Sequence, residues 1–282
     1  MKILVTIISA VFFCFNVSLA LGLSISKDGD LTGTGFDELG FNSSGLVGYW
    51  QFNGNAQDSS GQDNHGTVFG ASAVVDRVGT ASGALSFNGT SDYVLLDPVY
   101  QLSANNFTVA AWVKTAANGP VVGIKDGGPS THVFRIQNGF ICFRHYYNVW
   151  LYEYGAISVI DDQWHQLVWV NTGATQTMAM YVDGNVDVSG VDSRFFTGAR
   201  YVDVIGKDWA GYFNGSIDEV KIFSRALSAA EVQAMYNHEK GKFSAGDSGA
   251  YSALTFTEDP ALPVQMRSKK EGLTVRGSLV EE

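Results

Sequence analysis

A segment between residues 133 and 154 is unusually rich in arginine and aromatic side chains. Two strands are expected at 133–137 and 140–147, because Asn138-Gly139 between them is typical of a tight hairpin turn. Alternate side chains of a strand point to opposite faces. One face would therefore fill the core with Phe134, Ile136, Ile141 and Phe143. The candidate ligand-binding residues would lie on the other face of these two strands and in the segment that follows them: Arg135, Gln137, Arg144, Tyr146, Trp150 and Tyr152.

These residue types suit carbohydrate recognition, since a sugar offers C–H patches to aromatic rings and hydroxyl groups to planar donors such as guanidinium. The loops at 126–128 and 207–209 could form the rim of such a site. The same pattern is expected of any half-exposed sheet, so this simpler explanation stays open.

A calcium site is a second hypothesis, because a hard cation takes carboxylate and carbonyl oxygens from adjacent loops. Asp58 and Asn64 lie in a polar, glycine-containing loop after the run at 46–52, and Asp218 lies in a later run at 216–223. The alternative is that Asp58 only closes a turn and that Asp218 pairs with a neighbouring group. The chain has no dense string of alternating aspartates.

The elements that must position these residues are short runs of β-branched and aromatic residues, separated by Asn-Gly and Asp-Gly dipeptides. About a dozen such runs without alternating helices predict an all-β, two-sheet antiparallel sandwich. Four tryptophans inside these runs are expected in its core: Trp50, Trp112, Trp164 and Trp169. One short C-terminal helix is expected at about 229–237, since Ser228 and Glu231 form a capping box.

The two ends of the chain differ in residue composition and pattern from this central part. Residues 1–20 combine Lys2, an apolar run and small residues before position 21, which is typical of a secretory signal peptide. Residues 21–45 are expected to form a flexible arm, 46–240 the folded domain and 241–282 a polar tail. The signal's apolar run is shorter than the roughly 20 residues of a membrane span.

The composition also limits the classes of partner and site that the protein can have. The formal net charge of -10 argues against nucleic acid, whose phosphates require clustered lysine and arginine. Removal of the signal peptide would leave Cys142 as the single cysteine, which excludes an intramolecular disulfide and a cysteine-based zinc site. Cys142 lies in an apolar run and is expected to be a buried, inert thiol.

Six segments resemble, in order and spacing, the laminin-G-like domains of the concanavalin A-like lectin/glucanase superfamily. These segments are LVGYWQF with its loop (46–66), GALSFNGTSDYVLL (83–96), FTVAAWVKT (107–115), DDQWHQLVWV (161–170), MYVDGNV (180–186) and GSIDEVKIF with the helix (215–236). The resemblance implies a jelly-roll sandwich and a structural calcium near the first loop. It implies no single function, since one scaffold hosts many sites.

Glycoside hydrolases of that superfamily carry their carboxylates on alternate positions of one strand, and no such string occurs here. Asp218 and Glu219 are adjacent, which in a regular strand sends them to opposite faces. The sequence therefore favours a secreted, non-catalytic module that binds a glycan or extracellular-matrix ligand. Two alternatives stay open: a polysaccharide-active enzyme of hydrolase or lyase type, and a structural component of a cell surface or envelope.

Overall fold

The computed structural model divides the chain into two compact units, one from Ser44 to Lys242 and one formed by 1–43 and 243–282. The structure describes residues 42–102, 106–123, 132–147, 149–173, 175, 177–192 and 200–240. Only backbone is described at 97–101, 132, 145–147, 149–151, 191–192 and 200–201. The second unit is described only as short strands: β1 (Leu4–Thr6), β2 (Leu23–Ile25), β3 (Leu31–Gly33), β21 (Thr255–Thr257), β22 (Gln265–Arg267) and β23 (Ser278–Val280). Apart from these strands and residues 42–45 at the end of the arm, the predicted signal peptide, arm and tail lie outside the described residues.

One sheet of the Ser44–Lys242 unit contains seven strands, all paired antiparallel. Their spatial order is β13 (Val149–Ser158), β12 (Phe140–Tyr147), β11 (His132–Gln137), β10 (Gly119–Gly123), β17 (Arg200–Ile205), β8 (Tyr93–Leu102) and β5 (Gly66–Phe69). Strands β11 and β12 form the hairpin predicted around Asn138-Gly139, and both turn residues have positive φ angles, 55° and 86°. The turn chemistry thus fixes the register on which the candidate residues depend.

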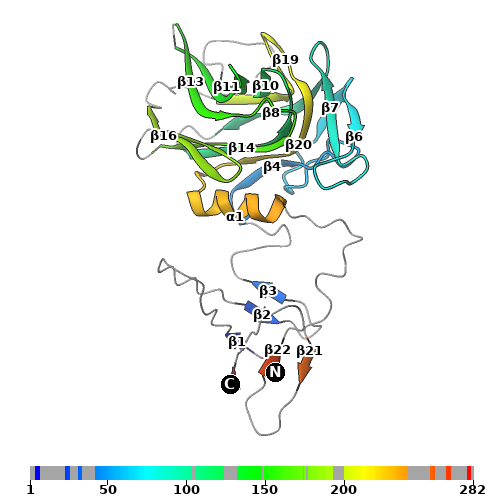
Figure 1. Ribbon diagram of the computed structural model, residues 1–282, viewed down its shortest axis with the longest axis vertical. Coiled ribbons are helices and arrows are strands. Elements are labelled where there is room, and N and C mark those ends of the chain that lie inside the picture. The colour runs from blue at the N-terminus through cyan, green and yellow to red at the C-terminus, as the bar shows by residue number, and fades with distance from the viewer. Residues whose placement is uncertain are drawn as a thin grey trace. The chain divides into compact units, whose positions relative to one another are not determined.

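The second sheet contains eight strands and packs against the first (Figure 1). Its order is β16 (Asn185–Asp192), β15 (Thr177–Val182), β14 (Trp164–Thr172), β9 (Asn106–Lys114), β20 (Asn214–Phe223), β7 (Ala84–Asn88) and β6 (Ser72–Val74), with β4 (Leu46–Trp50) paired to β20. A small hairpin, β18 (Lys207–Asp208) and β19 (Gly211–Tyr212), precedes β20. The predicted all-β sandwich is confirmed.

The core lies between the inner faces of the two sheets. Phe134, Ile136, Ile141 and Phe143 are fully buried in it, as the alternation predicted. The Cys142 side chain is also fully buried, but on the other face of its strand. Trp50 and Trp169 are also core residues, and the Trp169 ring meets the Phe134 ring edge-on at 5.4 Å. The prediction was wrong for Trp164, which is half-buried at the start of β14.

Helix α1 (Ala229–Lys240) lies on the outer side of the eight-stranded sheet, next to β4 and β14 in Figure 1. The predicted capping box is present: the Ser228 amide donates to Glu231 Oε2 at 2.8 Å, and the Glu231 amide donates to Ser228 Oγ at 3.3 Å. The helix continues to Lys240, three residues beyond the predicted end. Trp112 is buried beneath this helix, stacked on Tyr236 at 5.6 Å, rather than between the sheets.

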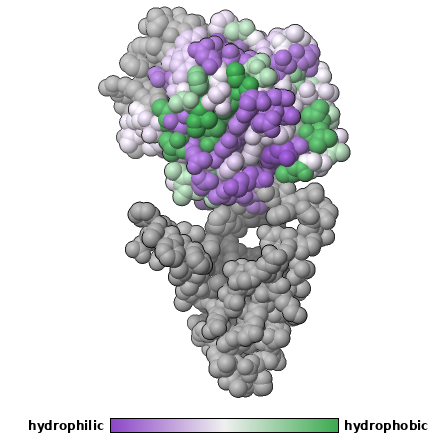
Figure 2. All heavy atoms as spheres, in the orientation of Figure 1, coloured by the Kyte–Doolittle hydropathy of each residue, from purple (hydrophilic) through white to green (hydrophobic). Residues whose placement is uncertain are grey.

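The surface of the described unit mixes residue types. In the view of Figure 2, hydrophobic residues form separate patches divided by hydrophilic ones. No helix of the described residues is both long and apolar enough to cross a membrane.

Candidate functional site

The outer face of the seven-stranded sheet brings together three of the predicted ligand-binding residues. Arg144 is paired with Val133 on one side and with Tyr152 on the other. Arg135 and Tyr154 are both paired with Cys142, in the neighbouring row. The residues that alternate with Arg135 and Arg144 along their strands face the core. The side chains of Arg135, Arg144, Tyr152 and Tyr154 therefore project from the opposite, outer face of the sheet.

A single aspartate from the β18–β19 hairpin holds the two arginines. Asp208 Oδ2 accepts hydrogen bonds from Arg135 Nη1 at 3.1 Å and from Arg144 Nη2, and the Asp208 side chain is almost fully buried. Asp208 Oδ1 accepts the Ala210 amide at 2.7 Å, which shapes the turn of the hairpin. This carboxylate therefore fixes both the guanidinium groups and the turn above them.

The Arg144 guanidinium lies against one aromatic ring, and two further rings stand on the neighbouring strand. Its Cζ lies 5.3 Å from the centre of the Trp209 ring, within range of a cation–π interaction, and Trp209 is 46% exposed at the tip of the hairpin. Tyr152 and Tyr154 stack with ring centres 6.1 Å apart and are 39% and 38% exposed. We call Arg135, Arg144, Tyr152, Tyr154, Asp208 and Trp209 the arginine–aromatic face. It presents three partly exposed aromatic rings, whereas its two guanidinium groups are nearly buried.

The electrostatics of this face follow from burial. Burial lowers the pKa of Arg135, and the adjacent charge of Arg144 acts in the same direction, while Asp208 opposes both. Burial also raises the pKa of the Cys142 thiol to about 12, so this cysteine stays neutral near pH 7. The expected burial of this thiol is therefore confirmed, and its lack of reactivity stays a prediction.

The structure describes the remaining predicted contact residues only in part. Gln137 is half-buried at the end of β11, next to the hairpin turn. Tyr146 and Trp150 are paired across β12 and β13, but their side chains lie outside the described residues, as does the loop at 126–128. Tyr154 was not among the candidate contacts, although its place two residues after Tyr152 gives it the same face.

The three predicted calcium ligands are each engaged by protein groups. Asp58 Oδ1 accepts the amides of Tyr49 and Ser60 at 2.8 and 2.9 Å, and Asp58 Oδ2 accepts Ser60 Oγ and the Asn64 amide at 2.8 and 2.9 Å. Asn64 Nδ2 donates to the Val47 carbonyl at 2.7 Å. Within the described ranges, no group of three or more His, Cys, Asp or Glu side chains is arranged to hold a metal ion. These contacts fit the alternative in which Asp58 closes its loop, and calcium stays a prediction.

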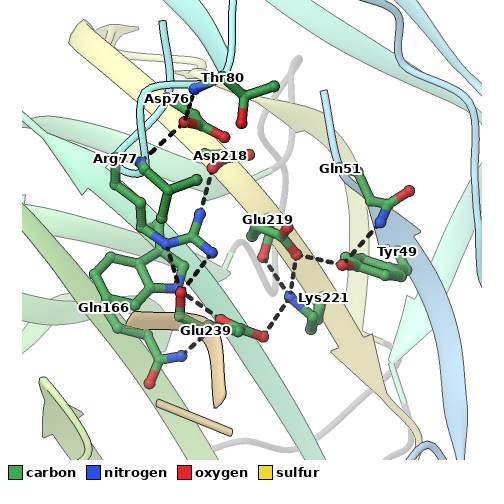
Figure 3. A network of polar contacts seen from close by, with 12 residues as sticks. Tyr49, Gln51, Asp76, Arg77, Thr80, Gln166, Asp218, Glu219, Lys221 and Glu239 are labelled. Carbon is green, nitrogen blue, oxygen red and sulfur yellow. Dashed lines mark hydrogen bonds and ion pairs between the residues drawn. The ribbon is translucent and has the colours of Figure 1, made fainter. Parts of the chain in front are cut away.

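Asp218 belongs instead to a buried polar network beneath helix α1, drawn in Figure 3. Arg77 Nη1 pairs with Asp218 Oδ2 at 2.6 Å. Lys221 Nζ lies 2.8 Å from both Glu219 Oε2 and Glu239 Oε1. Glu239 Oε2 accepts hydrogen bonds from Trp112 Nε1 at 2.6 Å and from Gln166 Nε2 at 2.9 Å. The network thus ties the last turn of α1 to strands β9, β14 and β20.

The expectation that Asp218 and Glu219 point to opposite faces is wrong. The pairing of β20 with β9 shifts register between Asp218 and Lys221, and Glu219 has a φ of 51°. This bulge inserts one residue, so both carboxylates lie on the helix side while Ile217 and Val220 enter the core. Asp218 and Glu219 are 1% and 5% exposed, so neither is open to a substrate.

The network has a pH dependence that we can predict. Burial raises the pKa of Asp218 to about 8, helped by the charge of Glu219 and opposed by Arg77 and Lys221. An acid whose pKa is higher in the folded protein binds a proton on folding. Its stabilising contribution is complete below the unfolded value near 3.8 and is lost as pH rises through about 8. We therefore expect the free energy of unfolding, measured in urea, to decrease as the pH rises from about 5 to about 9.

Asp218→Asn should remove that component, because an amide does not titrate. The difference in unfolding free energy between the two proteins should therefore change steadily over this pH window. A constant difference from about pH 5 to pH 9 would show that Asp218 is already ionised at the acid end.

Comparison with known proteins gives the family. The model of the concanavalin A-like lectin/glucanases superfamily, of laminin-G type, matches residues 88–233. The match covers more than half of the chain, which therefore belongs to this superfamily and confirms the resemblance of its sequence motifs. A comparison with curated proteins finds no match.

Solved structures share the fold at low sequence identity. Domain 4 of AbnA, an extracellular arabinanase from Geobacillus stearothermophilus in complex with arabinotriose, is 23% identical over 68% of this chain and 98% of its own, with a TM-score of 0.57. The binding domain of Paraclostridial Mosquitocidal Protein 1 is 14% identical over 70% of this chain and 53% of its own, with a TM-score of 0.55. The binding domain of botulinum neurotoxin DC, in complex with rat synaptotagmin II, is 14% identical over 69% and 52%, with a TM-score of 0.55. This chain spans about half of the two toxin domains.

Proposed function

We propose that the Ser44–Lys242 unit is a non-catalytic recognition module that binds a glycan or a glycoconjugate of the extracellular matrix. The observation that carries the proposal is the arginine–aromatic face, where Arg144 lies between Asp208 and the Trp209 ring, and next to Tyr152 in the sheet. The partly exposed rings of Trp209, Tyr152 and Tyr154 suit the C–H patches of a sugar. The nearly buried guanidinium of Arg144 lies against the Trp209 ring and holds it in place. The arabinanase domain with bound arabinotriose supports the proposal, since it places carbohydrate binding on the same fold.

Secretion is part of this proposal and rests on the residue pattern of 1–20. A structural calcium is also retained as a proposal. Because the Asp58 loop is already held by four hydrogen bonds, we expect calcium, if it binds there, to affect stability rather than sugar affinity. Measurements in calcium and in chelator separate these two effects.

The test is binding of the 21–282 protein to an array of glycans and matrix polysaccharides, followed by calorimetry on the strongest hit. Trp209→Ala and Tyr152→Ala should each weaken binding about tenfold or more, because truncating an aromatic contact at the centre of a site costs more than 1 kcal/mol. Val186→Ala is the matched control, since Val186 is 48% exposed on the other sheet. Its affinity should equal that of the unchanged protein.

Two outcomes would contradict the proposal. Affinity unchanged by both aromatic variants would place the site elsewhere on the molecule. A protein that is folded, as judged by its thermal melting, but binds no glycan on the array would overturn the recognition role itself.

A further inference from the structure

A second aromatic pair lies at the opposite edge of the seven-stranded sheet. Phe69 in β5 and Tyr93 in β8 are paired across the strands, and their rings stack at 4.7 Å with an angle of 11°. Phe69 is 41% exposed, whereas the neighbouring Val94 is fully buried in the core. By strand alternation, Phe69 and Tyr93 therefore project from the same outer face as Arg135 and Arg144.

The β18–β19 hairpin connects this pair with the arginine–aromatic face. Lys207 Nζ lies 5.3 Å from the centre of the Tyr212 ring and 6.0 Å from that of Tyr93. The next two residues, Asp208 and Trp209, contact Arg144. One short hairpin thus carries a cation toward Tyr93 and an exposed indole toward the arginines.

The first aromatic pair lies on the edge strand β5 and its neighbour β8, and the second lies on the opposite edge strand, β13. The distance between the pairs is therefore set by the separation of β5 and β13. Six inter-strand intervals separate these strands, and at about 4.8 Å each they span on the order of 29 Å along the sheet. A single sugar is much smaller than this distance. A ligand that contacts both pairs must therefore be a chain of several sugar units.

We propose that the outer face of the seven-stranded sheet binds an extended oligosaccharide that runs across the strands, with Phe69, Tyr93 and Lys207 as a subsite remote from the arginine–aromatic face. This inference rests on the proposed glycan-binding function and names the form of the ligand: the interior of a chain rather than a terminal sugar. A flat apolar patch would suit a protein partner. Here charged side chains stand between the aromatic pairs, which suits the alternating C–H patches and hydroxyl groups of a sugar chain.

The experiment uses the 21–282 protein and a size series, from disaccharide to octasaccharide, prepared from the array polysaccharide that binds most strongly. Affinity is measured by calorimetry for the unchanged protein, Phe69→Ala and Tyr152→Ala. The unchanged protein should gain affinity with chain length. Phe69→Ala should bind the disaccharide normally but bind the octasaccharide about tenfold more weakly, a loss equivalent to about 1.4 kcal/mol. Tyr152→Ala should weaken binding at every length.

Phe69→Leu and thermal melting show whether a loss of affinity comes from a folding defect. Leucine keeps the apolar contact with the sheet but lacks the ring. It should resemble Phe69→Ala in binding and the unchanged protein in melting. If both Phe69 variants bind the octasaccharide normally while Tyr152→Ala does not, the remote subsite is wrong and the proposed function stands. If the unchanged protein binds none of the series, both are overturned.

Discussion

Lys221→Met should lower the free energy of unfolding by roughly 3–5 kcal/mol, the cost of removing one partner from a buried ion pair. Lys221 is fully buried, and its Nζ lies 2.8 Å from carboxylate oxygens of Glu219 and Glu239. Burial lowers the pKa of Lys221, but the charges of the two glutamates outweigh burial and raise it above its usual value. The ammonium group is therefore charged at every pH near neutral, and methionine would leave the two carboxylates facing each other.

Urea unfolding of the full protein measures this effect. Lys240→Met is the matched control, because Lys240 is exposed at the end of α1, with Nζ 5.0 Å from the Tyr236 ring, and should lose no more than about 1 kcal/mol. Combining Lys221→Met with Glu219→Gln and Glu239→Gln should recover part of the loss, since the uncompensated charges disappear together. Equal stability of Lys221→Met and Lys240→Met would show that the buried pair contributes nothing.

The stability of Lys221→Met also tests how helix α1 is attached to the eight-stranded sheet. Only two apolar side chains of the helix, Val232 and Met235, are buried, while Glu239 in its last turn is 1% exposed. Glu239 also holds Arg77, whose Nε and Nη2 donate to the Glu239 carbonyl at 3.2 and 3.0 Å. We infer that the C-terminal end of α1 is attached to the sheet by charges, and its middle by apolar contacts.

Charge balance explains why the network tolerates burial. Three carboxylates (Asp218, Glu219 and Glu239) and two cations (Arg77 and Lys221) are nearly excluded from water. Burial raises the pKa of Asp218 and so favours its protonated form, in which two negative charges meet two positive ones. Proton uptake by Asp218 thus removes the excess charge that would otherwise be costly in this environment.

Local signals predicted the parts of the structure that depend on neighbouring residues. Asn138-Gly139 fixed the hairpin register and hence the faces of Arg135 and Arg144, and the Ser228–Glu231 capping box marked the start of α1. The bulge at Glu219 was missed because an inserted residue breaks the alternation without any change in residue type. Residues 207–209 were expected only as a possible rim, and the pairing of Asp208 with both arginines depends on where the β18–β19 hairpin lies. Phe69 meets Tyr93 only through the order of strands in the sheet, which no local pattern reveals.

Asp208→Asn should both destabilise the protein and abolish most of its sugar affinity. The Asp208 carboxylate is shared by two guanidinium groups whose side chains are only 12% and 6% exposed, so a neutral amide would leave two confined cations without their common counter-charge. We expect a loss of roughly 3–5 kcal/mol in unfolding free energy. Asparagine can still accept the Ala210 amide, so the change tests charge rather than the shape of the turn.

Asp63→Asn is the matched control, because the Asp63 side chain is 91% exposed and its change should be within about 0.5 kcal/mol of neutral. Arg144→Met combined with Asp208→Asn should be less destabilising than the sum of the two single changes, because removing one guanidinium relieves the repulsion left by the other change. Sugar binding by Asp208→Asn, measured where the variant is fully folded, should fall more than tenfold, since Arg144 would no longer be held beside Trp209. Normal affinity in a destabilised variant would separate the two roles: Asp208 would then be a structural residue, and the exposed rings alone would form the site.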